Sequence, residues 1–120
     1  GLTDDIVGFD YAPFSQVFGR AACVVHQAGV GTTGQVLRAG VPQLIMPFSH
    51  DQPDNAARVR RAGVAEIIRR GDYNAETASN ALKNILGEPG YSENARRLKQ
   101  IVDSENGTAI ACDAIEEVLR

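Results

Sequence analysis

Short apolar runs alternate with amphipathic segments over the first two thirds of the chain. The run Ala22–His26 is apolar up to its last residue, which is typical of a strand buried on both faces of a parallel sheet. Apolar residues spaced by three or four, bounded by proline or glycine, predict helices between such runs. We therefore expect strands at residues 6–9, 22–26, 43–46 and 64–68, and helices at residues 13–18, 32–39 and 51–62.

The last third of the chain has the pattern of helices alone. Asn74 can cap a helix that runs to Leu86, because its side chain can accept hydrogen bonds from the first turn. A turn at residues 87–90 leads to two further helices, at residues 92–104 and 108–119. The last of these carries an apolar stripe that we interpret as a packing surface. The stripe consists of Ile110, Ala114, Ile115, Val118 and Leu119.

Repeated strand-helix-strand units imply right-handed crossovers between parallel strands. The predicted fold class is therefore α/β, a Rossmann-like, doubly wound parallel sheet with a helical C-terminal part. A length of 120 residues suits a single domain, residues 1–120. The chain enters directly on a strand, so we expect it to be part of something larger. Ligands of such sheets bind at the carboxyl ends of the strands.

Composition narrows the classes of partner. With 43% apolar and 22% charged residues, the chain can bury a core. A net charge of −3, without a cluster of Lys or Arg, argues against nucleic acid as a partner. We interpret Cys23 and Cys112 as reduced, buried thiols. No apolar run approaches the ~18 residues of a membrane helix and no signal pattern opens the chain, so a cytoplasmic location is expected.

The candidate chemistry lies after the strand at 22–26. Gly29 and Gly31 leave backbone N–H groups open to an anion, and Thr32 and Thr33 add hydroxyl donors where the next helix begins. Asp51 and further polar residues follow the next strand. Because both segments end neighbouring parallel strands, we expect them to meet at one edge of the sheet. Such an edge suits a diphosphate attached to a hydroxyl-rich group.

Other interpretations of these residues stay open. Gly29–Gly34 also satisfies the G-x-G-x-x-G pattern of dinucleotide-binding folds, although the helix after it is cut short at Gly40. The glycines can instead permit close packing of a helix on a strand. Asp51 can cap the helix that begins beside it. Tyr11 and Phe14 can be core aromatics.

Four linked segments resemble the donor-binding half of nucleotide-sugar glycosyltransferases with two Rossmann-like domains, the GT-B architecture. The likeness is to the bacterial antibiotic, macrolide and sterol type and to the plant secondary-metabolite type. It extends from Tyr11 to about Ala65. The segments are Tyr11-Ala12-Pro13, His26–Thr33, Arg38–Gln43, and Pro47 followed by Asp51, Gln52 and Asn55.

The resemblance implies a role for each matching residue. The donor diphosphate would lie against Gln27, Gly29, Gly31, Thr32 and Thr33. Asp51 and Gln52 would bind hydroxyls of the transferred sugar. Tyr11, Ala12 and Phe14 would contact the base, and Gln35 the ribose, where many relatives carry a glutamate.

One position departs from the family pattern. An ungapped alignment places Gln27 where relatives carry the histidine that contacts phosphate, and His26 falls one position earlier. Successive side chains of a strand point to opposite faces, so the two do not serve the same ligand. We assign the phosphate role to Gln27 and interpret His26 as a packed or supporting residue. His50 has no assigned role.

The resemblance further implies an inverting, metal-independent transfer of a hexosyl group from a UDP- or dTDP-sugar to an acceptor hydroxyl. The general base and the acceptor pocket would lie on an N-terminal domain that this chain lacks, so we assign no catalytic residue, metal ligand or cofactor here. The chain alone is then expected to be inactive, and an uncovered apolar face would allow it to associate as a homo-oligomer. The alternatives are a stand-alone donor-binding subunit of a two-chain transferase and a dinucleotide- or nucleotide-binding module without transferase activity.

Overall fold

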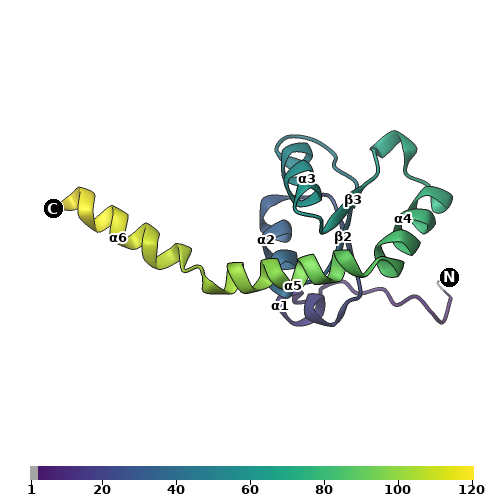
Figure 1. The fold of residues 1–120 in the computed structure, drawn as a ribbon, viewed down its shortest axis with the longest axis horizontal. Coiled ribbons are helices and arrows are strands. Elements are labelled where there is room, and N and C mark those ends of the chain that lie inside the picture. Colours follow the sequence, from purple (N-terminus) through teal and green to yellow (C-terminus); the bar gives the residue numbers. More distant parts are fainter. Residues whose placement is uncertain (1–2) are drawn as a thin grey trace.

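The computed structural model describes residues 3–120 and contains a three-stranded parallel sheet with helices on both faces (Figure 1). The strands are β1 (Val24–His26), β2 (Gln43–Ile45) and β3 (Ala65–Ile67), in the order β1-β2-β3. The helices are α1 (Phe14–Val17), the 3₁₀ helix η1 (Phe18–Arg20), α2 (Val30–Ala39), α3 (Gln52–Arg61), the 3₁₀ helix η2 (Arg70–Asp72), α4 (Ala75–Gly87), α5 (Pro89–Ser104) and α6 (Gly107–Leu119).

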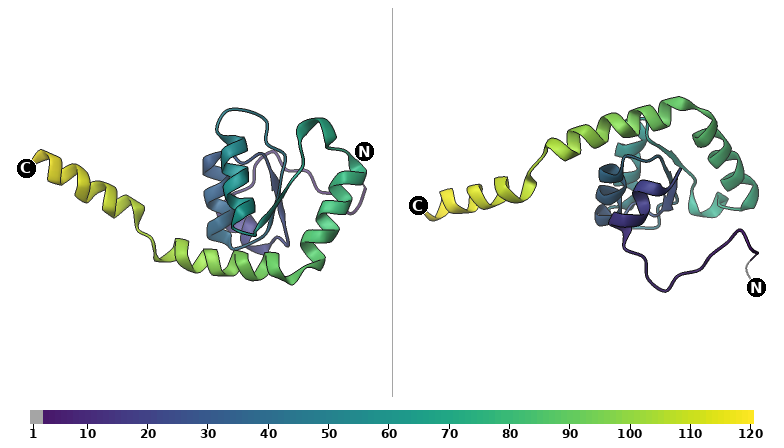
Figure 2. Two further views of the ribbon diagram at one scale, coloured as in Figure 1. Left: turned by 45° about the horizontal axis from the view of Figure 1, so that its top comes forward. Right: turned by 90° about the horizontal axis from the view of Figure 1, so that it is seen from below.

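The sheet lies between two layers of helix. Helices α2 and α3 lie side by side on one face and α4 lies on the other, while α5 passes along one end of the sheet (Figure 2). Side chains alternate accordingly, because strand residues point to opposite faces in turn. Ile45 packs in a cluster with residues of α3, whereas its neighbour Leu44 packs with Ile85 of α4.

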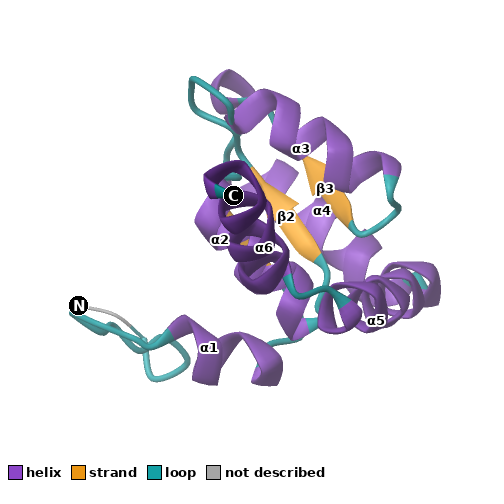
Figure 3. Ribbon diagram, turned by 90° about the vertical axis from the view of Figure 1, so that its left-hand side faces the viewer, coloured by secondary structure: helices purple, strands orange, loops and turns teal. Residues whose placement is uncertain are grey.

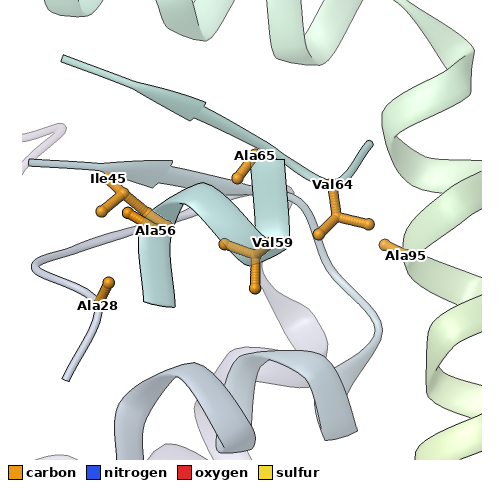
Figure 4. Packing of buried hydrophobic residues seen from close by; sticks show 7 residues of the cluster. All are labelled: Ala28, Ile45, Ala56, Val59, Val64, Ala65 and Ala95. Carbon is orange, nitrogen blue, oxygen red and sulfur yellow. The ribbon is translucent and has the colours of Figure 1, made fainter. Parts of the chain in front are cut away.

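The larger core cluster joins β2, β3, α3 and α5 with the turn after β1 (Figure 4). All its members are at most 6% exposed, and burying such side chains is the main favourable term in folding. The cluster consists of Ala28, Ile45, Ala56, Val59, Val64, Ala65 and Ala95. It ends at Ala28, so the turn that follows β1 is part of the rigid core.

The predicted parallel α/β arrangement is confirmed, with differences at element ends. The strands expected at 22–26, 43–46 and 64–68 are present, each as three residues. Helix α2 begins at Val30, two residues before the predicted start, and α5 begins at Pro89. The turn predicted at 87–90 is therefore wrong, since Glu88 alone separates α4 from α5.

The strand predicted at residues 6–9 is also wrong. The segment has no regular structure and pairs with no strand among the described residues. Its apolar side chains are 55% to 75% exposed at Ile6, Val7 and Phe9. An apolar run becomes a strand only where a neighbour accepts its backbone hydrogen bonds and covers its side chains, and neither happens here.

The prediction that β1 is buried on both faces holds for only one face. Val24 is 8% exposed, but Val25 is 48% exposed. β1 is an edge strand within the described sheet, and Val25 points to the same face as Leu44, where α4 packs against β2 and β3. The side chains on the α2 face of β1 are therefore the ones that the fold holds in place.

The C-terminal helices separate into a packed and an unpacked part. Asn74 caps α4 as predicted, with its side chain accepting from the N–H groups of Glu76 and Thr77. α5 packs against α2 and α4, but α6 leads away from the rest of the chain (Figure 1) and therefore points toward the viewer in Figure 3. The predicted packing role of the α6 stripe is wrong within the described residues, because Ile110, Ile115, Val118 and Leu119 are 61% to 86% exposed.

Both cysteines are free thiols. Cys23 is half-buried, and burial raises the pKa of its thiol. Cys112 on α6 is exposed, so the expectation that both thiols are buried is wrong for this one. Among the described residues, no helix has both the length and the apolar composition needed to cross a membrane.

Candidate functional site

The turns that follow β1 and β2 lie together at the carboxyl edge of the sheet. The N–H of Met46, directly after β2, donates to the carbonyl of His26 at the end of β1. The side chain of Asn55, on α3, reaches the carbonyl of Ala28 in the first turn at 2.9 Å. The two polar segments that are 20 residues apart in sequence therefore form one continuous surface, as the parallel topology predicted.

The N-terminus of α2 is open. Gly29 occupies its N-cap position and no side chain caps the helix. The first N–H to find a helix partner is that of Thr33, which donates to the carbonyl of Gly29 at 2.9 Å. The preceding N–H groups, of Val30, Gly31 and Thr32, have no helix carbonyl to reach. They lie at the positive end of the helix dipole, which attracts anions.

The two glycines keep this helix end uncovered. A Cβ atom placed on Gly29 or Gly31 would meet no atom within 4 Å beyond its chain neighbours and the helix backbone, so the space beside both glycines is open. Neither glycine has a positive φ; the left-handed residue of the turn is Ala28, at φ 69°. The glycines therefore contribute space rather than an unusual backbone, which differs from the usual reason for glycine in a turn.

Ala28 is held in its left-handed conformation by two side chains. Its N–H donates to Nδ1 of His26 at 3.0 Å, and its carbonyl accepts from Nδ2 of Asn55. The residue is fully buried beside Ile45 and Ala56 (Figure 4). A left-handed residue other than glycine costs roughly 1 kcal/mol, and these bonds with the surrounding packing offset that cost.

His26 is a neutral, supporting residue in this arrangement. Because Nδ1 accepts from Ala28, its proton lies on Nε2, which donates to Oε1 of Gln43 at 2.7 Å. Burial lowers the pKa of the imidazole, and the bond to Gln43 opposes that change in part. The geometry agrees with the interpretation of His26 as a packed or supporting residue.

The N-terminus of α3 differs from that of α2. Asp51 stands at the N-cap but makes no capping bond, so the capping interpretation is wrong; its carboxylate instead accepts from Asn55 at 2.9 Å. Oε1 of Gln52 accepts from the N–H groups of Phe48 at 2.7 Å and Ser49 at 3.0 Å. Asp54 adds a second acid in the first turn. Because Oε1 of Gln52 is engaged and Asp54 is paired with Arg58, this helix end offers mainly the Asp51 carboxylate and the Gln52 NH₂ group, which suit hydroxyl groups.

The third helix at this edge of the sheet, α4, has no free first turn. Asn74 accepts from the N–H groups of Glu76 and Thr77, and the Thr77 hydroxyl accepts from the N–H of Asn74 in return. This capping box satisfies the donors that α2 leaves open. Of the three helices that follow the described strands, α2 alone combines an uncapped start with an uncharged first turn.

A cleft of about 340 Å³ groups four of the predicted site residues. These are Gln27, Gly29, Thr32 and Gln52, and His26 lines the same cleft. A cavity of about 550 Å³ groups the four residues predicted for base and ribose. These are Tyr11, Ala12, Phe14 and Gln35. Phe14 lines both, so the two spaces adjoin through its ring.

Phe14 also serves the fold. Its ring stacks on Phe18 with 4.5 Å between centroids, and it is 42% exposed. It therefore combines the packing role and an accessible surface. Tyr11 is 82% exposed and makes no such stack. A cavity of about 480 Å³ near Glu66 and Tyr91 contains none of the predicted site residues.

Three predicted residues lie outside the two spaces. Gly31 lines neither, although its N–H belongs to the open helix end. Asp51 is exposed at the rim, beside Gln52. Thr33 points into the protein: its hydroxyl is buried without a partner among the described residues, and its N–H is bound to Gly29. Thr33 thus does not offer the phosphate donor that the sequence predicted.

Asn55 is the residue whose role the sequence did not reveal. Its amide donates both to Ala28 and to Asp51, so it ties the start of α3 to the turn before α2. The spacing of Asp51 and Asn55 in the sequence could have predicted their contact, because side chains four residues apart lie next to each other on a helix. Arg70 is a second such residue, with its guanidinium 3.8 Å from the ring centre of Phe48, next to the turn that Gln52 holds.

Metal-ligating side chains do not cluster at this edge. Within residues 3–120, no group of three His, Cys, Asp or Glu side chains is arranged to hold a metal ion.

Comparison with known families gives a match over nearly the whole chain. Residues 1–116 match the family described as "Erythromycin biosynthesis protein CIII-like, C-terminal domain". An O-mycaminosyltylonolide 6-deoxyallosyltransferase from Streptomyces fradiae is 38% identical over 117 residues, which are 97% of this chain and 28% of that protein. A sterol 3-beta-glucosyltransferase from Komagataella phaffii is 36% identical over 110 residues, which are 92% of this chain and 9% of that protein.

The fold has matching solved structures. The crystal structure of the glycosyltransferase VinC in complex with dTDP superposes with a TM-score of 0.82 and 28% identity, covering 87% of this chain and 26% of VinC. The chain thus spans about a quarter of the length of this structure and of the Streptomyces relative.

Proposed function

The chain belongs to the EryCIII-like C-terminal domains of GT-B glycosyltransferases, and on that premise we propose that it binds the nucleotide-sugar donor of a hexosyl transfer. The diphosphate would lie at the N-terminus of α2, in contact with Gln27 and the N–H groups of Gly31 and Thr32. The sugar would lie toward Asp51 and Gln52. The nucleoside would occupy the neighbouring cavity.

The difference between α2 and α3 carries this proposal. A nucleotide-sugar has a charged middle and a neutral, hydroxyl-rich end. The open, uncharged start of α2 suits the middle, and the acids and amide at the start of α3 suit the hydroxyls. The cleft lined by both Gly29 and Gln52 allows one ligand to reach both helix ends.

The order of the two spaces supports the same orientation. The cavity lined by Tyr11, Ala12, Phe14 and Gln35 adjoins the cleft at Phe14 of α1, and no residue of α3 lines it. A base could lie against an exposed aromatic ring, and the Gln35 amide could bond a ribose hydroxyl. A thymidine or uridine diphosphate is the proposed nucleotide; VinC, whose structure holds dTDP, is consistent with the former.

The proposed chemistry is an inverting transfer that does not depend on a metal ion. An acceptor hydroxyl would attack the anomeric carbon as the bond from that carbon to the diphosphate oxygen breaks, and the hydroxyl proton would pass to a general base outside this chain. The leaving diphosphate gains charge as the bond breaks. Fixed N–H groups at the start of α2 would stabilise that charge more in the transition state than in the ground state.

Two other functions remain for comparison. A dinucleotide-binding module would use the same glycines for its single pyrophosphate, and its second nucleoside would then lie toward Asp51 and Gln52 in place of the sugar. A stand-alone donor-binding subunit would have the same site and would differ only in receiving its acceptor pocket from another chain. The curated relatives are longer than this chain. We propose that the acceptor pocket belongs to a part of the enzyme that corresponds to the additional residues of these relatives.

An amide NMR titration of the chain tests the proposal. UDP and dTDP should shift the amides of Gly29, Gly31 and Thr32, and their glucose conjugates should in addition shift Asp51 and Gln52. A response to NAD alone would favour the dinucleotide module. No response to any of these ligands at pH 7.5 would contradict a donor site at the start of α2.

A further inference from the structure

We propose that neutral His26 is the positioning residue of the donor site, and that its protonation weakens nucleotide-sugar binding by releasing the Ala28 turn. This inference rests on the proposed function, because it concerns how the same site is held. His26 need not touch the ligand for this role. It acts through the backbone that precedes α2.

The Ala28 peptide controls how α2 begins. Ala28 is the residue directly before the N-cap of α2, so its φ and ψ angles set the direction in which the helix begins. Its N–H donates to Nδ1 of His26, a contact that spans two residues and resembles the turn that an asparagine side chain makes with its own backbone. Loss of this bond leaves a buried N–H without a partner, and left-handed alanine loses one of its two supports.

The hydrogen bond to Gln43 fixes the tautomer of His26. Oε1 of Gln43 can only accept, so it holds the single proton of the neutral ring on Nε2 and leaves Nδ1 free to accept. Gln43 is itself fully buried on β2, which fixes the ring from behind. A second proton would bind to Nδ1, which would then be a donor facing the N–H donor of Ala28. Protonation therefore removes the bond that holds the turn and leaves the bond to Gln43 intact.

Among residues 3–120, the side chains that line the cleft with His26 supply no counter-charge. The residues that line the cleft with it are uncharged, from Phe14 and Phe18 beside α2 to Gln52 on α3. A carboxylate is linked to the Ala28 turn through hydrogen bonds: Asn55 donates both to the Ala28 carbonyl and to Asp51, the N-cap residue of α3. Burial lowers the pKa of His26 below its usual value of about 6.5. The neutral ring is therefore the folded state's preferred form, and stability falls as the pH drops below about 6.5.

Two effects of opposite sign follow for a bound diphosphate. A positive ring would attract it, whereas the displaced turn would turn the α2 N–H groups away from it. We expect the second effect to dominate, because the N–H groups of Gly31 and Thr32 would bond the diphosphate directly, whereas the His26 ring, which lines the same cleft, is bound to Ala28 and Gln43. An affinity that rises on acidification would mean that the charge dominates, and it would overturn the proposal.

The experiment begins with NMR of the free chain. Side-chain nitrogen spectra should show His26 with a bare Nδ1 and a protonated Nε2 at pH 7.5, and the Ala28 amide should shift with the same midpoint as the His26 ring. UDP-glucose binding is then measured by calorimetry one pH unit above and one below that midpoint. UDP-glucose is the suitable probe, because it lacks the terminal phosphate whose last proton titrates at about pH 6.

The expected result is a loss of about tenfold in affinity across that interval, since the competent fraction falls from about nine tenths to about one tenth. The variant His26→Asn keeps an acceptor for the Ala28 N–H without a titrating group, and should bind at pH 7.5 with a flat pH profile. His50→Asn is the matched control, because His50 is the other histidine of the chain, is exposed, and has a φ of 57° that asparagine tolerates. It should keep the profile of the unmodified chain.

The outcomes separate this inference from the proposed function. Absence of UDP-glucose binding at pH 7.5 contradicts the proposed function, and the inference falls with it. Binding that is present and equal at both pH values contradicts only the role of His26, as does a pH profile that persists in His26→Asn. If His26→Asn does not fold, an Ala28 amide that stays still while His26 titrates in the unmodified chain overturns the inference by itself.

Discussion

Helices α2 and α3 begin side by side at the same sheet edge, yet their first turns have opposite chemistry. α2 starts after Gly29 with no cap and no charge, and α3 starts after Asp51 with a second acid in its first turn. Both are preceded by a left-handed residue other than glycine, Ala28 or His50. The topology therefore provides two equivalent helix ends, and local sequence makes one of them attractive to anions and the other to hydroxyl groups.

The two turns also differ in how they are held. The turn before α2 is held by the side chain of His26, at the end of β1, and by that of Asn55, on α3, and it lies in the core. The turn before α3 is held by its own Gln52 and is more exposed. A turn that is supported from outside can leave its following N–H groups free for a ligand. The comparison predicts that changes at the first turn affect the site more than changes at the second.

Asn55 links the two turns, and its substitution should have the largest effect on stability. Asn55→Asp cannot donate, so it leaves the Ala28 carbonyl unpaired and places a second carboxylate against Asp51. We expect a loss of about 2 to 3 kcal/mol in the free energy of unfolding, measured by urea denaturation. Asn80→Asp on the exposed surface of α4 is the matched control and should change little. Equal stability of the two variants would show that the tie has no energetic role.

The contrast in charge can be removed by giving α2 an acid. Gly31→Asp places a carboxylate in open space at the helix start, where it stabilises the helix but repels a diphosphate. We expect UDP-glucose to bind about thirtyfold more weakly than to Gly31→Asn, about 2 kcal/mol by calorimetry. The Asn variant has the same shape without the charge. If the two variants bind alike, phosphate does not lie at this helix end.

The hydroxyl-binding role of α3 can be tested from the other side. Asp51→Ala should weaken binding of UDP-glucose about tenfold and of UDP hardly at all, because only the sugar would meet this carboxylate. Asp54→Ala removes an acid from the same turn that is paired with Arg58, and it serves as the control. Equal losses for the two ligands would remove the sugar from this part of the proposal.

The smallest expected effect separates the two threonines of α2. Thr32→Val removes a hydroxyl that lines the cleft, and should weaken UDP and UDP-glucose alike, each about threefold, with little change in stability. Thr33→Val replaces a buried, unpartnered hydroxyl with a methyl group of the same size, and should leave binding unchanged while stability stays equal or rises. If only Thr33→Val weakened binding, then Thr33, and not Thr32, would be the threonine that faces the ligand.

The failed assignment of Thr33 shows how far local pattern extends. Successive residues of a helix are turned by about 100°, so Thr32 and Thr33 cannot both face one ligand. Thr33 lies three residues before Val36, and both are buried on the α2 face that packs on the sheet. That spacing was present in the sequence. However, the predicted helix began at Thr32, two residues too late, so the sequence did not show which side of the first turn faces the sheet. Packing of α2 on the sheet defined that side.

Ala28 is the clearest case in which sequence had no signal. The pattern pointed to the glycines as the residues that leave N–H groups open, and nothing in it indicated that a buried alanine adopts the left-handed angle. Only the long-range bond from Asn55, 27 residues away, together with the bond from His26, makes that conformation stable. The exposed stripe of α6 is the converse case, because an amphipathic pattern alone does not specify what covers it.

The sequence by itself determined the order of the three paired strands and of the helices between them, the parallel sheet, and the two polar segments that meet at its edge, although it also predicted a strand at residues 6–9 that does not form. These follow from hydrophobic period and turn chemistry, which depend on near neighbours and on the handedness of crossovers. Tertiary structure decided which N–H groups stay free, which residue adopts the left-handed turn, and which threonine faces the cleft. Those choices depend on hydrogen bonds and packing between residues far apart in the chain, whose partners become known only when the helices are seated on the sheet.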